Sequence, residues 1–121
     1  MPTIQPQPDR EAVQAFARDL VRIPSPSGSE GALAERLATE MQRLGYDEVR
    51  VDAMGNVIGR VGAPGDAAVL FDGHMDVVGV GDRRLWSRDP YGGVVEDGVL
   101  YGRGAADMKG GLAAMVHGLG A

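Results

Sequence analysis

Apolar side chains recur at helical spacing in three stretches of the chain. The first stretch begins after Asp9, which is placed to cap a helix, and ends before Pro24. The second is closed by Gly45, a residue suited to the left-handed cap of a helix. The apolar positions are Val13, Phe16, Ala17, Leu20 and Val21 in the first stretch, Leu33, Leu37, Met41 and Leu44 in the second, and Leu112, Met115, Val116 and Leu119 in the third. This pattern predicts three amphipathic helices.

The region between the second and third helices carries the patterns of β-strands. Val49 and Val51 alternate with charged neighbours, and a turn at residues 54–56 leads into more apolar residues, which predicts a pair of short strands. Residues 67–71 are apolar without interruption, as in a central strand that helices cover on both faces. Residues 86–101 place valines between turn signals, which predicts a hairpin at a sheet edge. We therefore expect an α/β fold with a mixed sheet flanked by helices, in a single domain over residues 1–121.

Composition narrows the class of protein. The 121 residues are 44% apolar, which fits a globular domain with a modest core. The net charge of -5 argues against nucleic acid or an anionic membrane as the main partner. The sequence has no cysteine, so a bound metal would be held by imidazole and carboxylate groups.

The start of the sequence carries no sign of export. Residues 1–8 are polar and rich in proline, without the basic start and apolar run of a secretion signal. No apolar run approaches the roughly 20 residues that a membrane-spanning helix needs. We therefore expect a soluble cytoplasmic protein without a membrane partner.

Residues 72–76, Asp-Gly-His-Met-Asp, directly follow the predicted central strand. His74 and Asp76 point to the same side of an extended chain, at the strand end where open α/β sheets bind ligands. A histidine that binds a metal needs a partner on its second ring nitrogen, and Asp76 offers a carboxylate. The alternative is a surface turn in which a histidine is bonded to a nearby aspartate, and this short motif alone leaves both interpretations open.

Residues 102–111 form a glycine-rich loop that enters the third predicted helix. The dinucleotide-binding pattern requires glycine where Asp107 stands, and the P-loop pattern requires serine or threonine where Gly110 follows Lys109. A carboxylate at the centre of the loop suits a cation better than a phosphate. The loop is therefore the second candidate for a metal site.

Together, the two motifs resemble a family of zinc metallopeptidases and deacylases. The family includes aminoacylase, acetylornithine deacetylase, succinyl-diaminopimelate desuccinylase and carboxypeptidase G. The resemblance covers nearly the whole chain, in order and spacing, through residues 23–25, 29–30, 52–57, 73–78, 86–93, 98–104 and 107–111. Residues 71–74 and 89–91 are most similar to a branch of selenium-metabolism hydrolases. The resemblance implies the fold of a zinc-exopeptidase catalytic domain.

The same resemblance implies a role for three residues. His74 would bind one metal ion, Asp107 would bridge two ions, and Asp76 would act in catalysis by bracing the imidazole of His74. The ions would be zinc, with cobalt or manganese as alternatives. The peptide bond between Asp107 and Met108 is expected to be cis. The substrate would be a small N-acyl amino acid or peptide, and intact relatives would be homodimers.

The resemblance also implies groups that this sequence does not contain. Relatives carry a Glu-Glu pair after the bridging aspartate, the first as general base and the second as metal ligand, whereas no glutamate follows Glu96 here. A further acidic ligand, a histidine ligand and a dimerisation domain are missing too. We therefore expect a partial, truncated catalytic domain with weak metal binding and negligible hydrolysis, and leave open whether the chain alone is an enzyme. The rival hypothesis is a non-catalytic α/β module for binding or interaction.

Other polar and aromatic residues favour structural roles. We expect His117, in the last helix, to be structural or solvated. Trp86 and Tyr91 would pack the hairpin against the core. Arg103 fits a hydrogen bond to loop carbonyls better than binding of a substrate carboxylate. Lys109 is expected to be a solvated charge.

Overall fold

The computed structural model describes residues 7–121 of the chain. The polar start of the sequence lies mainly in residues 1–6, outside the described part. In chain order the elements are α1 (Arg10–Arg22), α2 (Gly31–Arg43), β1 (Glu48–Val51), β2 (Val57–Arg60), the 3-10 turn η1 (Arg83–Leu85), β3 (Val94–Glu96), β4 (Val99–Tyr101), the kinked turn η2 (Ala105–Lys109) and α3 (Gly110–Leu119). The α/β class expected from the sequence is confirmed. The expected mixed sheet is not formed within residues 7–121, where the strands make two separate antiparallel pairs.

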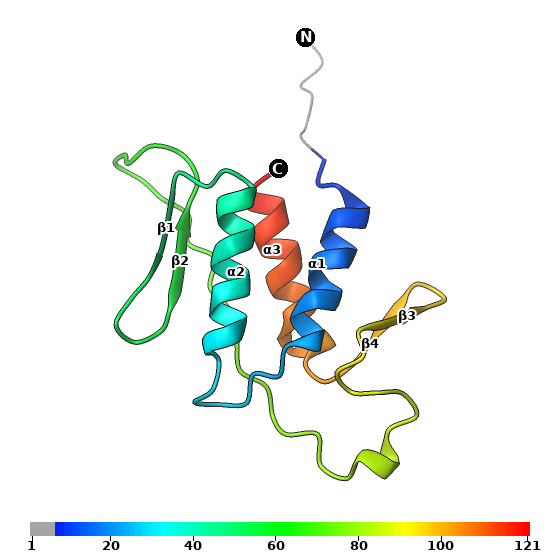
Figure 1. Cartoon of the computed structure of the whole chain (residues 1–121). Coiled ribbons are helices and arrows are strands. Elements are labelled where there is room, and N and C mark those ends of the chain that lie inside the picture. The colour runs from blue at the N-terminus through cyan, green and yellow to red at the C-terminus, as the bar shows by residue number, and fades with distance from the viewer. Residues whose placement is uncertain (1–6) are drawn as a thin grey trace.

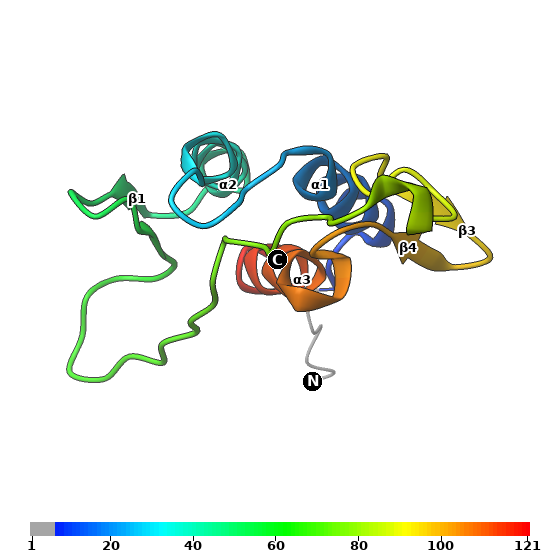
Figure 2. The ribbon, with the colours of Figure 1, turned by 90° about the horizontal axis from the view of Figure 1, so that it is seen from below.

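Three helices form the centre of the molecule. They run side by side in Figure 1, and the view from below in Figure 2 places α3 on one side of the α1 and α2 pair. The core between them is built from Phe16, Ala17 and Leu20 of α1, Leu33 and Leu37 of α2, and Leu112, Ala113 and Val116 of α3. The apolar stripes predicted for the three helices therefore face one another. Each side chain of Leu or Phe size buried here contributes roughly 1.5–3 kcal/mol.

The helix boundaries follow the capping signals of the sequence. The carboxylate of Asp9 accepts hydrogen bonds from two N–H groups of the first turn of α1, at 3.0 and 3.2 Å. Gly45 adopts a φ of 80° just after α2, and the N–H of Tyr46 then reaches back to the carbonyl of Met41 at 3.1 Å. A left-handed residue in this place closes the last turn of a helix, which is why glycine stands there.

Two antiparallel hairpins flank the helices (Figure 1), β1–β2 next to α2 and β3–β4 next to α1. Asp97 and Gly98 connect β3 and β4 with φ angles of 50° and 77°, the left-handed pair that a tight hairpin turn requires. Both predicted hairpins are confirmed. The β3–β4 hairpin is a two-stranded sheet of its own rather than the edge of a larger one.

The central strand predicted at residues 67–71 is not formed, and this prediction is wrong for the described part of the chain. Val69, Leu70 and Phe71 are 82%, 88% and 54% exposed, and neither sheet includes them. A strand needs neighbours that pair with its backbone, and β1–β2 and β3–β4 each pair only within themselves. The segment instead runs as an extended connection, and Leu70 and Phe71 line an open groove with residues of α2, β2 and α3.

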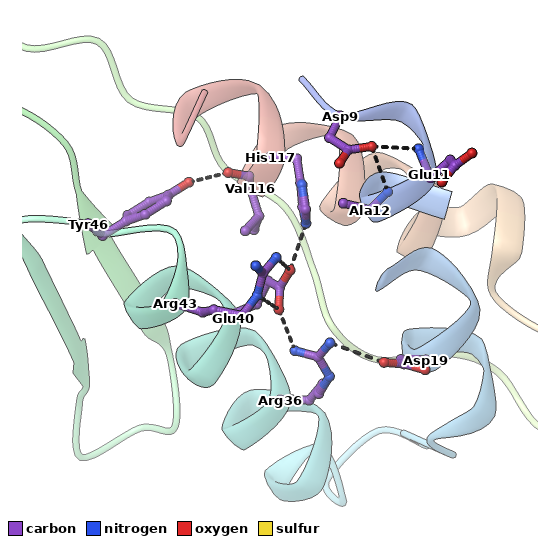
Figure 3. A network of polar contacts seen from close by, with 10 residues as sticks. All are labelled: Asp9, Glu11, Ala12, Asp19, Arg36, Glu40, Arg43, Tyr46, Val116 and His117. Atoms are coloured by element: carbon purple, nitrogen blue, oxygen red, sulfur yellow. Dashed lines mark hydrogen bonds and ion pairs between the residues drawn. The ribbon is translucent and has the colours of Figure 1, made fainter. Parts of the chain in front are cut away.

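A buried polar cluster joins α2 to α3 beside the apolar core (Figure 3). Glu40 and His117 are each 3% exposed, and His117 Nε2 lies 2.8 Å from Glu40 Oε1. Arg36 and Arg43 donate to the Glu40 carboxylate as well, at 2.9 and 2.6 Å. These contacts hold the pKa of Glu40 at about 2, with the hydrogen bond from Arg43 as the largest cause. His117 therefore occupies a structural position, as expected.

Among the helices of residues 7–121, none is long and apolar enough to cross a membrane.

Candidate functional site

The fold brings His74, Asp76 and Asp107 together. His74 Nε2 lies 2.8 Å from Asp107 Oδ1, although the two residues are 33 positions apart in the sequence. On the other side of the ring, His74 Nδ1 lies 3.1 Å from Asp76 Oδ1 and 3.0 Å from the Asp76 carbonyl oxygen. Each ring nitrogen thus faces a carboxylate. The juxtaposition that the resemblance implied is present, while the roles of the three residues as ligands and brace stay predictions.

Contacts of Gly73 and His74 with the Met108 side chain hold the two motifs together. The N–H of His74 donates to Met108 Sδ at 3.3 Å, which links the first motif to the residue after Asp107. A Cβ on Gly73 would lie 2.9 Å from the Met108 side chain, so only glycine fits at this crossing without displacing Met108. The peptide bond between Asp107 and Met108 is cis, as the resemblance implied.

The electrostatics of the site favour charged side chains. The hydrogen bond to Asp107 raises the pKa of His74, and the backbone and charge of Asp76 raise it further. A hydrogen bond from Ser27 holds the pKa of Asp76 below its ordinary value. The side chains of His74, Asp76 and Asp107 are 49%, 41% and 85% exposed. The site is therefore open to ions from solvent.

The donor atoms fit one side of a metal site. Zinc binds imidazole nitrogen and carboxylate oxygen at about 2.0–2.2 Å, so two ligands on one tetrahedral ion lie about 3.3–3.4 Å apart. His74 Nε2 and Asp107 Oδ1 lie 2.8 Å apart, so a shift of about half an ångström would admit the ion between them. Zinc usually takes at least three protein ligands. Within residues 7–121 no group of three or more histidine, aspartate or glutamate side chains is arranged to hold an ion.

Two residues near the site were not predicted to take part in it. Ser27 lies in the loop between α1 and α2, and its Oγ donates a hydrogen bond of 2.5 Å to Asp76 Oδ2. Lys109 was expected to be solvated, and that expectation is wrong, because its side chain is 0% exposed and Nζ donates to the Ile23 carbonyl at 2.6 Å. Burial lowers the pKa of Lys109 to about 8. Both contacts span long stretches of sequence, so periodicity and local motifs carry no signal for them.

Arg103 is held by an aromatic ring. Its guanidinium carbon lies 4.9 Å from the centroid of the Trp86 ring, and Trp86 Nε1 donates to the Val80 carbonyl at 2.8 Å. The Nε of Arg103 is buried and has no hydrogen-bond partner among the described residues. The hydrogen bond to loop carbonyls expected of this residue is therefore not made by Nε, and cation–π stacking takes its place.

These features define an α/β domain with an exposed histidine held between two carboxylates, the donor types of a hard or borderline metal ion. Residues 70–121, which contain all three side chains, match the family described as Peptidase family M20/M25/M40.

Curated relatives extend the similarity beyond these residues. The chain is 44% identical over 102 residues to "Uncharacterized protein YgeY" of Escherichia coli (strain K12), a match that covers 84% of this chain and 25% of that protein. It is 46% identical over 105 residues to succinyl-diaminopimelate desuccinylase of Cereibacter sphaeroides (strain ATCC 17029 / ATH 2.4.9), covering 84% of this chain and 28% of that protein. The corresponding protein of Rhodospirillum centenum is 41% identical over 113 residues, covering 88% and 29%.

The chain belongs to peptidase family M20/M25/M40. It spans a quarter to three tenths of the length of these curated relatives.

Proposed function

We propose that the chain carries part of the metal site of a hydrolase that cleaves amide bonds of N-acyl amino acids or small peptides. The observation that carries the proposal is the 2.8 Å approach of His74 Nε2 to Asp107 Oδ1, with Asp76 on the far side of the ring. Membership of a peptidase family and the similarity to desuccinylases support the reaction class. Zinc is the proposed metal, and cobalt or manganese would suit the same nitrogen and oxygen donors.

In this proposal His74 and Asp107 bind the cation, and Asp76 orients the His74 ring. Asp76 keeps the proton on Nδ1 of His74, which leaves the lone pair of Nε2 for the metal. Asp107 offers one oxygen beside His74, and its largely exposed carboxylate leaves the second oxygen for another ion. When bound, divalent ions would supply Lewis-acid polarisation of the substrate carbonyl and a lowered pKa for water.

The general base of the reaction is proposed to lie outside this sequence. A base must lie within hydrogen-bond reach of the proton that it removes, and a glutamate fills this role in the family that the chain resembles. The sequence contains no glutamate after Glu96. We therefore propose that the chain by itself binds metal weakly and does not hydrolyse substrate.

Calorimetric titration of the metal-free protein with zinc tests the metal site. The wild type should give saturable heat, and Asp107→Asn should lower the affinity at least tenfold because it removes the charge of one of the two ligands while keeping the shape of the side chain. Asp72→Asn is the matched control, since Asp72 is an exposed aspartate two residues before His74. The proposal fails if the wild type and Asp107→Asn give the same heat, or if Asp72→Asn weakens binding as much as Asp107→Asn does.

A further inference from the structure

The carboxylate of Asp76 has a partner on each oxygen. Oδ1 faces His74 Nδ1 at 3.1 Å, and Oδ2 accepts the hydroxyl hydrogen of Ser27 at 2.5 Å. Rotation about the last torsion of an aspartate has only broad preferences, so a carboxylate with one partner can turn away from it. Two partners on opposite oxygens fix the plane of the group. The hydrogen bond from Ser27 therefore fixes the orientation in which the Asp76 carboxylate meets the His74 ring.

The loop that carries Ser27 is anchored on both sides of Asp76. Ser25 is 0% exposed, and its hydroxyl donates to the carbonyl of Met75 at 2.8 Å. The N–H of Val77 donates to the carbonyl of Ser25 at 2.9 Å, and Pro26 and Val77 form a parallel bridge. The backbone neighbours of Asp76 are thus fixed to the loop. Ser27 is exposed, and the backbone contacts of Ser25 and Pro26 with residues 75–77 place it beside Asp76.

The same loop also holds the segment that carries Asp107. Lys109 is fully buried, and its ammonium donates a hydrogen bond of 2.6 Å to the carbonyl of Ile23. Residues 23–27 are therefore bonded to both motifs of the site, at positions 75–77 and at position 109. A rigid support of this kind is what a ligand pair from two distant segments needs.

We propose that Ser27 is a positioning residue, whose hydroxyl fixes the Asp76 carboxylate and through it the orientation and tautomer of the His74 imidazole. The hydroxyl of Ser27 bonds to Asp76 and not to His74, so it acts on the imidazole through Asp76. Its importance for metal affinity rests on the function proposed above, whereas its effect on the His74 ring is a property of the metal-free protein.

Nitrogen-15 NMR of the metal-free protein tests the inference directly. Spectra are recorded above the pH at which the imidazole loses its charge, where the ring-nitrogen shifts report which nitrogen carries the remaining proton. The sequence has two histidines, and His74→Ala assigns the signals. Ser27→Ala should raise the fraction of the Nε2–H tautomer of His74, because Asp107 Oδ1 lies 2.8 Å from Nε2 and competes with Asp76 for the proton. Ser27→Thr should restore the wild-type shifts because it returns the hydroxyl.

Ser29→Ala is the matched control, since Ser29 is exposed and lies two residues further along the same loop. Ser27 is exposed too, so its alanine variant should keep the thermal midpoint of the wild type. The inference is overturned if the His74 shifts of Ser27→Ala coincide with those of the wild type, or if Ser29→Ala moves them equally.

Zinc affinity supplies a second measurement with a different point of failure. Ser27→Ala should weaken zinc binding about tenfold, as removal of a group that orients a metal ligand typically does, and should add nothing in an Asp76→Ala background. Equal losses in both backgrounds would overturn the inference, since they would mean that Ser27 acts independently of Asp76. A wild type that binds no zinc would overturn the proposed function, and the NMR shifts would still decide the role of Ser27.

Discussion

The molecule contains two histidine–carboxylate pairs with the same contact distance and opposite surroundings. His117 lies 2.8 Å from Glu40, and His74 lies 2.8 Å from Asp107. The side chains of the first pair are 3% and 4% exposed, and those of the second are 49% and 85% exposed. Distance alone therefore does not distinguish a structural pair from a candidate metal site.

The difference lies in what else each carboxylate binds. Both oxygens of Glu40 are engaged by Arg36, Arg43 and His117, so this carboxylate has no room for another cation. Asp107 makes one side-chain contact, with His74, and is otherwise open to solvent. The buried pair joins α2 to α3, whereas the exposed pair has spare lone pairs. We infer that the first contributes to stability and the second to binding.

The largest expected effect is on the buried pair. Glu40→Ala should lower the free energy of unfolding by about 2–4 kcal/mol, because it leaves His117 buried without a partner and Arg36 partly buried without its nearest charge. Urea denaturation followed by circular dichroism measures the change. Glu35→Ala, an exposed site on the same helix, is the control and should stay within about 0.5 kcal/mol of the wild type. A loss below 1 kcal/mol for Glu40→Ala would remove the distinction drawn between the pairs.

The pH dependence of stability sharpens the same comparison. The pKa of Glu40 is about 2 in the folded protein and near its ordinary value of 4.5 in the unfolded chain. Its contribution is therefore fully present above pH 4.5 and is lost as the pH falls through 2. The difference in unfolding free energy between the wild type and Glu40→Gln should shrink by on the order of 2–3 kcal/mol across this window. A difference that stays constant from pH 6 to pH 2 would contradict the assignment.

Replacing the two histidines separates stability from binding. His117→Ala should lower the free energy of unfolding by roughly 1–3 kcal/mol, since it removes a buried ring that packs 5.3 Å from Phe16 and bonds to Glu40. His74→Ala should change it by less than about 0.5 kcal/mol, because this side chain is half exposed. Zinc titration should show the reverse, with binding lost in His74→Ala and kept in His117→Ala. If both variants lost stability, or both lost zinc binding, the distinction between the structural pair and the binding pair would be wrong.

Much of this structure could be predicted from residue patterns. Asp9 and Gly45 mark helix ends through local hydrogen bonds and backbone conformation, and the Asp97-Gly98 pair marks a hairpin turn in the same way. These signals work because cause and effect lie within a few residues of each other. The two motifs around His74 and Asp107 could be joined only through resemblance to a family, since no local rule relates residues 33 positions apart.

The features that could not be predicted depend on long-range contacts. Apolar residues at 67–71 have the composition of a buried strand, yet a strand forms only where other strands pair with it. Lys109 has the composition of a surface residue, but the Ile23 carbonyl gives its ammonium a partner inside the protein. Ser27 is an ordinary loop serine until the fold brings it to Asp76.

The extended connection at residues 67–71 has a further consequence for the integrity of the molecule. Exposed backbone outside helices and sheets is where proteases cut most readily. One cleavage there would leave α1 and α2 on one peptide and His74, Asp107 and α3 on the other. The helices on the two peptides still share one apolar core, so a nicked protein should stay assembled without a covalent link between its halves.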